Sequence, residues 1–262
     1  MALEDKILDE LATVVDEAAR NSEPVKMLTA DYPEMTLEDA YTIQRRSMAR
    51  RYARGESLVG MKMGLTSKAK MEQMGVHNPI YGHLTDAMML GDGAEISAGD
   101  YCHPRVEPEI AFVMGEDLSG EVGPREALSA VEKVCGALEI IDSRYQNFEF
   151  TLIDVVADNA SSTGFALGTT TAKPDELELG NLGMVMSVNG EVVETGSSAA
   201  ILEHPARSLA ALSAMLHERG EGLKAGQVVL AGGATKAVHV EAGDQVELEV
   251  DGLGRIQLRV LQ

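Results

Sequence analysis

Two glutamates, Glu107 and Glu109, open an apolar run and are the first residues whose spacing suggests chemistry. On an extended strand, residues i and i+2 point to the same face, so we expect the two carboxylates to project together. Like charges held this close make ionisation unfavourable, and a cation between them relieves that cost. Oxygen ligands suit a hard divalent ion, Mg²⁺ or Mn²⁺, better than zinc. A solvated edge strand is the plainer interpretation of the same spacing, and the pair alone does not decide between the two.

Glu139 and Lys62 are charged residues inside runs that are otherwise apolar. Glutamate is rarely buried unless it is paired or binds a metal, so Glu139 could complete a three-carboxylate site with Glu107 and Glu109. A buried lysine can serve as an acid, a base or an electrostatic stabiliser. Lys62 could equally be an exposed lysine on a sheet edge, and the pattern leaves both interpretations open.

Two further segments could line a pocket beside these charges. Residues 154–162 are rich in Asp, Asn and Ser and could hydrogen-bond a carbonyl or carboxylate, although an ordinary capping turn has the same composition. The backbone N–H groups of residues 231–235, which include Gly233 and Thr235, could cradle an anion. This run is not a phosphate-binding loop, because it lacks the Gly-Lys-Ser/Thr sequence of that motif at the required spacing.

Composition excludes several classes of function. The chain has 262 residues, 45% of them hydrophobic, and a formal net charge of −20, which disfavours binding to nucleic acid or to an anionic membrane. No segment is long and apolar enough to cross a bilayer, and the acidic N-terminus lacks the basic start of a signal peptide. Two cysteines, Cys102 and Cys135, do not make a disulfide framework. We therefore expect a cytoplasmic location.

The hydrophobic pattern divides the chain into a helical region, residues 1–57, and a strand-rich region, residues 58–262. Helices expected at 3–20 and 37–53 should form a layer on the rest, because so short a region buries little alone. Beyond residue 58 the pattern predicts an α+β fold with a curled, mostly antiparallel sheet. The expected strands are 58–63, 110–114, 134–141, 163–169, 184–188, 191–194, 228–230, 245–250 and 254–260. Helices are expected at 67–74, 124–133 and 206–218, and residues 79–92 should be irregular.

Six ordered motifs between residues 58 and 260 resemble those of the fumarylacetoacetate hydrolase superfamily, and most closely those of its hydratase/decarboxylase branch. The motifs are 60–67, 81–88, 103–109, 139–144, 157–162 and the glycine pair 232–233. The resemblance implies a mixed β-roll core with an N-terminal helical cap. It also implies a Mg²⁺ or Mn²⁺ site made by Glu107, Glu109 and Glu139, and a functional lysine at Lys62.

The residues around Lys62, with Lys68 and Lys70 after it, are more similar to the decarboxylases of that branch. The resemblance then implies decarboxylation of 2-oxo-3-hexenedioate to 2-hydroxypenta-2,4-dienoate and CO₂ in aromatic degradation. It implies an oligomer and a complex with the hydratase that consumes the product. The alternatives are a 2-hydroxypenta-2,4-dienoate hydratase, a related C–C hydrolase, or a protein that binds a metal or small molecule without catalysis.

Weaker candidates complete the predicted site. Asp86 is a candidate acid/base or lid residue, while Ser161, Thr235 and Gly233 are candidates for binding the substrate. The distal carboxylate of a dicarboxylic substrate needs a weak contact at the mouth of the pocket, and four basic residues are candidates for it. They are Lys68, Lys70, Arg105 and Arg144.

Overall fold

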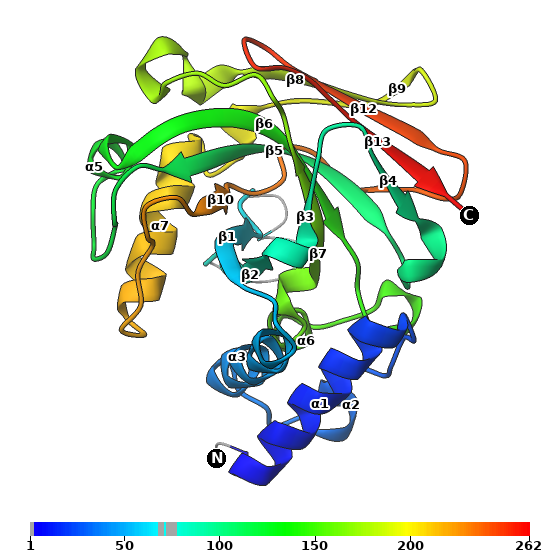
Figure 1. The fold of residues 1–262 in the computed structure, drawn as a ribbon. Coiled ribbons are helices and arrows are strands. Elements are labelled where there is room, and N and C mark those ends of the chain that lie inside the picture. Colours follow the sequence, from blue (N-terminus) through cyan, green and yellow to red (C-terminus); the bar gives the residue numbers. More distant parts are fainter. Residues whose placement is uncertain (1–2, 68–70, 72–77) are drawn as a thin grey trace.

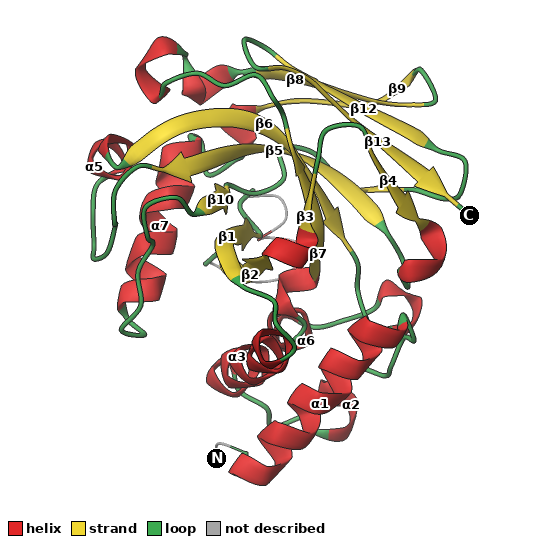
Figure 2. Ribbon diagram, in the orientation of Figure 1, coloured by secondary structure: helices red, strands yellow, loops and turns green. Residues whose placement is uncertain are grey.

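The strands of the chain form two sheets, seen in Figures 1 and 2. The computed structural model describes residues 3–67, 71 and 78–262. The larger sheet has eight strands, with β11 (Val238–His239) pairing with β5 outside the main order. That order is β2 (Ile80–Thr85), β1 (Leu58–Gly64), β10 (Val228–Leu230), β5 (Arg105–Met114), β6 (Val131–Ile141), β7 (Ser162–Leu167) and β3 (Met89–Leu90).

The smaller sheet lies across the outer face of the arch that β5 and β6 form (Figure 2). Its order is β4 (Ala94–Ser97), β13 (Gly254–Leu261), β12 (Gln245–Val250), β8 (Gly183–Val188) and β9 (Glu191–Ser197). Gly136 of β6 makes the close approach possible, because a Cβ there would lie 2.8 Å from a side-chain carbon of Ile256. One hydrophobic core therefore runs from the larger sheet into the smaller one.

The N-terminal helices α1 (Asp5–Asn21), α2 (Leu28–Asp31) and α3 (Leu37–Ala53) lie at the opposite end of the molecule from the smaller sheet (Figure 1). A capping box between Thr36 and Asp39 begins α3. The Gln44 side chain donates hydrogen bonds to the carbonyls of Tyr81 and Val156, and the Tyr41 ring stacks on Tyr81 at 4.8 Å. The helices are thus attached to β2 and to α6 (Leu152–Ala157). That residues 1–57 and 58–262 are the two parts of the chain stays a prediction.

The predicted α+β class and the curled sheet are confirmed, as are both long N-terminal helices and the hairpin of β8 and β9. Residues 79–92 are not irregular, because Ile80–Thr85 pairs along the whole length of β1. The helix expected at 124–133 ends early: α5 is Pro124–Ser129, and Lys133 and Val134 already pair with β5. Pairing with a long neighbouring strand outweighs local helix preference there. The helix expected at 67–74 lies largely outside the described residues.

The last helix, α7 (Pro205–His217), stands beside β10 in Figure 1. Its Ser208 hydroxyl donates a hydrogen bond to the carbonyl of Ala231, directly after β10. Of the helices that the structure describes, none is long and apolar enough to cross a membrane.

Gly82 is the residue of β2 whose substitution tests this packing. A Cβ at Gly82 would lie 2.5 Å from the carbonyl oxygen of Asn159, which is backbone and cannot turn away. We expect Gly82→Ala to lower the free energy of unfolding by about 1–3 kcal/mol, as overpacking usually does. Gly91→Ala is the control, since a Cβ there meets no atom within 4 Å. Urea unfolding measures both; equal stability of the two variants would contradict the packing described here.

Candidate metal centre and active site

Glu107, Glu109 and Glu139 come together on the concave face of the larger sheet. Glu107 and Glu109 lie two apart on β5, and Glu139 of β6 is paired directly with Glu107. One carboxylate oxygen from each lies within 4.8 Å of the others, and all three residues are buried. Strand β5 lies between β10 and β6, so the interpretation as a solvated edge strand is wrong.

The carboxylates of Glu109 and Glu139 accept few hydrogen bonds from the described residues. Glu109 Oε2 accepts one from the N–H of Gly232 at 2.7 Å, whereas its Oε1 and both oxygens of Glu139 accept none from the described residues. Burial, and then the charge of Glu139, raises the pKa of Glu109 well above its ordinary range. Burial also raises the pKa of Glu139, although Lys62 opposes the shift. Buried oxygens without donors, in a cluster of like charges, are the features that a bound cation would explain.

Lys62 reaches this cluster from β1. Its strand lies between β2 and β10 and its side chain is buried, so the interpretation as an edge lysine is wrong. The Nζ atom lies 3.0 Å from Glu139 Oε2, as an ion pair without hydrogen-bond alignment, and donates to the carbonyl of Ala160 at 3.1 Å. Burial lowers the pKa of Lys62, but the charges of Glu139, Glu109 and Glu107 outweigh it and raise the pKa. The amine is therefore a protonated cation at neutral pH.

A left-handed turn delivers the Ala160 carbonyl to Lys62. Asn159, Ala160 and Ser161 have φ values of 50°, 52° and 58°, a conformation that costs free energy in any residue other than glycine. The Asn159 side chain holds the turn against β2 by accepting from the N–H of His83 and donating to its carbonyl. Ser161 follows, buried, and its hydroxyl has no hydrogen-bond partner within the described part of the chain. The turn thus places Ala160 and Ser161 beside the acidic cluster.

Arg144 supports this turn from behind. Its guanidinium is buried, forms an ion pair with Asp158, and donates to the carbonyls of Asp142 and Asp158 and to the hydroxyl of Thr163. With these partners Arg144 cannot contact a substrate at the mouth of the pocket, so that expectation is wrong. The sequence around Arg144 does not predict this role, because its hydrogen-bond partners are mostly backbone carbonyls.

A cavity of about 530 Å³ opens in front of Lys62 and Glu107. Its polar wall includes Ser161 and Arg105, and its apolar wall includes Phe148 and Phe150. The remaining lining residues are Gly64, Leu65, Ile80, Ile141, Val155, Ala160, Lys236 and Ala237. The charged cluster therefore lies at the floor of a partly apolar pocket, as is usual for small-molecule sites.

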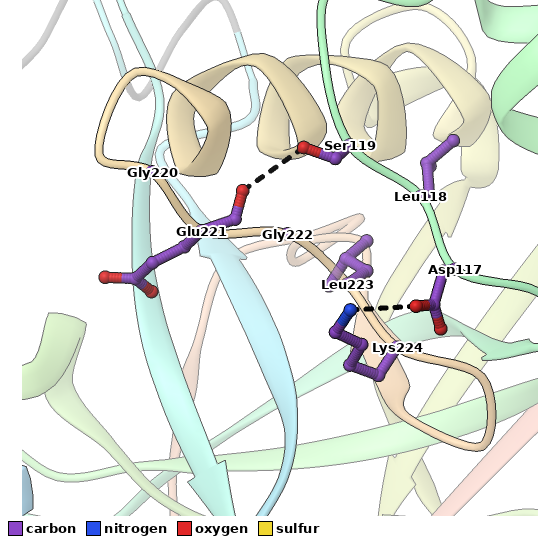
Figure 3. Close-up of a pocket in the computed structure, with 8 residues that line it drawn as sticks. All are labelled: Asp117, Leu118, Ser119, Gly220, Glu221, Gly222, Leu223 and Lys224. Atoms are coloured by element: carbon purple, nitrogen blue, oxygen red, sulfur yellow. Dashed lines mark hydrogen bonds and ion pairs between the residues drawn. The ribbon is translucent and has the colours of Figure 1, made fainter.

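A second hollow of similar volume, about 550 Å³, lies at the surface between residues 117–119 and 220–224 (Figure 3). Two of its charged groups already form a pair, since Lys224 donates to Asp117 at 2.8 Å, and the Ser119 hydroxyl donates to the backbone carbonyl of Glu221 at 3.3 Å. It contains no buried carboxylate cluster, so we place the candidate site in the cavity at Lys62.

Several predicted site residues lie elsewhere. Asp86 is exposed at the far end of β2, where its carboxylate accepts from the N–H groups of Ser57 and Ala87, so the structure does not bring it to the cavity. Thr235 and Gly233 do not line the cavity either, and the hydroxyl of Thr235 donates to the carbonyl of Lys236. Lys68 and Lys70 lie outside the described residues.

Gly232, rather than Gly233, is the glycine that contributes to the cluster. Its φ of 112° favours glycine, and a Cβ there would lie 2.1 Å from the hydroxyl oxygen of Thr66. This conformation directs its N–H at Glu109. The pair of glycines was the sequence signal, but it could not say which N–H is used. Phe148 and Phe150 were missed altogether, because two aromatic residues in a loop have no distinctive pattern.

Known proteins share this fold and much of this sequence. The family profile described as fumarylacetoacetate (FAA) hydrolase C-terminal matches residues 55–261. A 4-oxalocrotonate decarboxylase from a Pseudomonas species is 49% identical over 249 residues, which are 95% of this chain and 96% of that protein. A 2-hydroxyhexa-2,4-dienoate hydratase from Comamonas testosteroni is 39% identical over 246 residues, 93% of each chain.

A solved structure extends the comparison to three dimensions. The structure of 4-oxalocrotonate decarboxylase from Pseudomonas putida G7, complexed with magnesium and adipate, has a TM-score of 0.97, is 44% identical and covers 99% of both chains. The resemblance read from the six motifs is thus confirmed at the level of sequence, profile and fold. The chain belongs to the fumarylacetoacetate hydrolase family.

Proposed function

We propose that this protein is a Mg²⁺-dependent carboxy-lyase that converts 4-oxalocrotonate, also called 2-oxo-3-hexenedioate, to 2-hydroxypenta-2,4-dienoate and CO₂ in the degradation of aromatic compounds. One observation carries the proposal: three buried carboxylates and a buried lysine meet beside a cavity of about 530 Å³, which is large enough for a small molecule. The similarity to 4-oxalocrotonate decarboxylases over nearly the whole chain supports the choice of reaction.

We assign the metal to Glu107, Glu109 and Glu139. Their donor set is entirely oxygen, which fits a hard divalent cation. The oxygens of Glu109 and Glu139 that accept no hydrogen bond from the described residues fit a ligand role. Mg²⁺ is the cation in the related magnesium-bound structure, and Mn²⁺ suits the same donors. When bound, the cation supplies positive charge for the C1 carboxylate and the C2 oxygen of the substrate.

Lys62 is the residue that we place at the reacting oxygen. Breaking the C5–C6 bond sends its electron pair through the C3–C4 double bond to the C2 oxygen, and C6 leaves as CO₂. Negative charge develops on the C2 oxygen, where a protonated amine stabilises it and can donate the proton that gives the enol. The raised pKa of Lys62 fits an acid or an electrostatic group rather than a general base.

Other residues of the cavity hold the substrate and exclude water. Ser161 lines the cavity and its hydroxyl has no hydrogen-bond partner among the described residues, so we assign it the role of donating a hydrogen bond to the C1 carboxylate. The rings of Phe148 and Phe150 make the wall apolar, which favours loss of a charged carboxylate as neutral CO₂. Asp86, Thr235 and Gly233 take no part in this proposal, because they lie outside the cavity.

The decisive experiment compares two reactions of the purified protein. We expect Mg²⁺-dependent CO₂ release from 2-oxo-3-hexenedioate that is abolished by EDTA, and poor hydration of 2-hydroxypenta-2,4-dienoate. The hydratase is the alternative, since a hydratase is among the relatives at lower identity. Efficient hydration without CO₂ release would establish the alternative, and no turnover of either compound would leave a binding protein.

We further propose a cytoplasmic protein that assembles as an oligomer and associates with the dienoate hydratase. The product is an unstable dienol that a hydratase consumes, so direct transfer would limit its loss. Two free cysteines, Cys102 and Cys135, fit a reducing compartment. Analytical ultracentrifugation of the protein, alone and mixed with such a hydratase, tests both assemblies.

Lys62→Met removes the charge and keeps a long apolar side chain. We expect kcat to fall on the order of 10²-fold or more, as for loss of a positioned acid or electrostatic group. Mg²⁺ affinity should not decrease, because the variant loses a cation that competes for Glu139. Lys133→Met on the same sheet, outside the cavity, is the control. Steady-state kinetics and calorimetry decide; a folded Lys62→Met enzyme with unchanged kcat would show that Lys62 has no role in turnover.

Glu109→Gln keeps the shape of the side chain and removes a ligand charge. The raised pKa means that the metal-free protein loses stability as pH rises from the ordinary glutamate range through the folded-state pKa. We therefore expect the metal-free variant to be more stable than the parent at neutral pH. Mg²⁺ should bind the variant at least about ten-fold more weakly, because even substitution of a residue that only hydrogen-bonds a metal ligand lowers metal affinity by that factor.

Thermal unfolding with and without Mg²⁺ measures both effects of Glu109→Gln. The control is Glu116→Gln, an exposed carboxylate just beyond the same strand. A Glu109→Gln protein that Mg²⁺ stabilises as strongly as the parent would contradict the assignment of the metal ligands.

A further inference from the structure

Arg105 differs from the other shielded arginines of the described chain. Six arginines of the described residues are buried or half-buried, and five of them form ion pairs with carboxylates. These five are Arg45, Arg46, Arg51, Arg144 and Arg219. Arg105 forms no ion pair with any described residue, and its Nε atom is buried without a hydrogen-bond partner. In a chain with a formal net charge of −20, a shielded cation without an acidic partner indicates a missing anion.

The position of Arg105 relative to the acidic cluster is fixed by the strand. Arg105 is the first residue of β5, and Glu107 follows two residues later on the same face. Both side chains line the same cavity. Two residues of a strand span about 6.6–6.8 Å, so the backbone positions of Arg105 and Glu107 are separated by roughly that distance.

Phe148 orients the guanidinium. The Arg105 Cζ atom lies 4.1 Å from the centroid of the Phe148 ring, which also lines the cavity. Stacking on an aromatic face holds the plane of the guanidinium and leaves its edge, which carries the N–H donors, free for a planar anion. A carboxylate is the planar anion that this edge binds best.

We propose that Arg105 binds the distal, C6 carboxylate of the substrate, with Phe148 as the platform that orients it. The inference rests on the proposed function, which places C1 and C2 at the acidic cluster. An extended six-carbon chain separates the C2 oxygen from the C6 carboxylate by about the length of two strand residues. The cavity therefore selects a 2-oxo dicarboxylate over a 2-oxo monocarboxylate of equal length.

The same contact limits how Arg105 affects the rate. The C6 carboxylate loses its charge as CO₂ forms, so the ion pair is present in the bound substrate and weakens in the transition state. Binding of this kind lowers KM without raising kcat. Arg105 is thus a specificity and positioning residue, and its removal should raise KM for the dicarboxylate without lowering kcat.

Two ligands that differ only at C6 test the inference without turnover. 2-Oxohexanedioate has the second carboxylate and 2-oxohexanoate has a methyl group there. Calorimetry with the Mg²⁺-loaded protein should give about ten-fold tighter binding of the dicarboxylate, the usual scale for a charge-assisted hydrogen bond. In Arg105→Met, which keeps an apolar chain over Phe148, the ratio should fall to about two-fold or less. Affinity for 2-oxohexanoate and for Mg²⁺ should stay unchanged.

Two further variants distinguish the effect of the planar guanidinium on this affinity ratio from the effect of positive charge alone. Arg105→Lys keeps the charge but loses the planar edge, and we expect an intermediate ratio. Arg125→Met removes one positive charge from an exposed arginine outside the cavity, and the ratio should equal that of the parent.

A parent protein that binds both ligands equally, or an Arg105→Met variant that weakens both equally, would overturn the role of Arg105 and leave the proposed function intact. Failure of the Mg²⁺-loaded parent to bind either ligand would overturn the proposed function and this inference together.

Discussion

The burial of three carboxylates beside one lysine is the constraint on which the rest of this structure depends. Lys62 forms an ion pair with Glu139, and the like charge of Glu109 lies beside that pair, fully buried, as an excess of negative charge. The raised pKa values of Glu109 and Glu139 are the physical sign of that excess. A sequence selected for stability alone would replace such a cluster with apolar residues, so its presence is best explained by a bound divalent cation and the chemistry that the cation permits.

Paired strands of the larger sheet bring these four groups together. The register of β5 and β6 sets Glu107 opposite Glu139, and β1 enters the same sheet between β2 and β10 to deliver Lys62. Small residues make the close approaches: Gly82 admits the left-handed turn at Asn159, and Gly232 turns its N–H toward Glu109. The buried ion pair of Arg144 and Asp158 holds that turn in a conformation that the backbone would otherwise avoid. Positioning on rigid elements is what a metal centre and a proton donor both require.

The sequence predicted the cluster better than the fold around it. Local sequence patterns were enough to find the cluster, and they can be read without knowing how the strands pair. These patterns are the i, i+2 spacing of Glu107 and Glu109 and the charges of Glu139 and Lys62 inside apolar runs. Strand register and the separation into two sheets depend on contacts between distant segments, so the pattern placed the last strands in one sheet and missed the pairing of Ile80–Thr85 with β1. Asp86 shows the limit most clearly: it belongs to a motif whose Gly82 packs against the turn at Asn159 beside the site, yet it lies on the exposed end of the strand.

The most direct test of the account is the position of a divalent cation in crystals grown with Mn²⁺, located by anomalous scattering. We expect one strong peak bounded by carboxylate oxygens of Glu107, Glu109 and Glu139, at about the 2.0–2.2 Å typical of oxygen ligands to small hard cations. The peak should disappear in crystals of a Glu109→Gln protein grown in the same way. Mn²⁺ bound elsewhere on this acidic surface, with no peak at the three glutamates under saturating metal, would contradict the central claim.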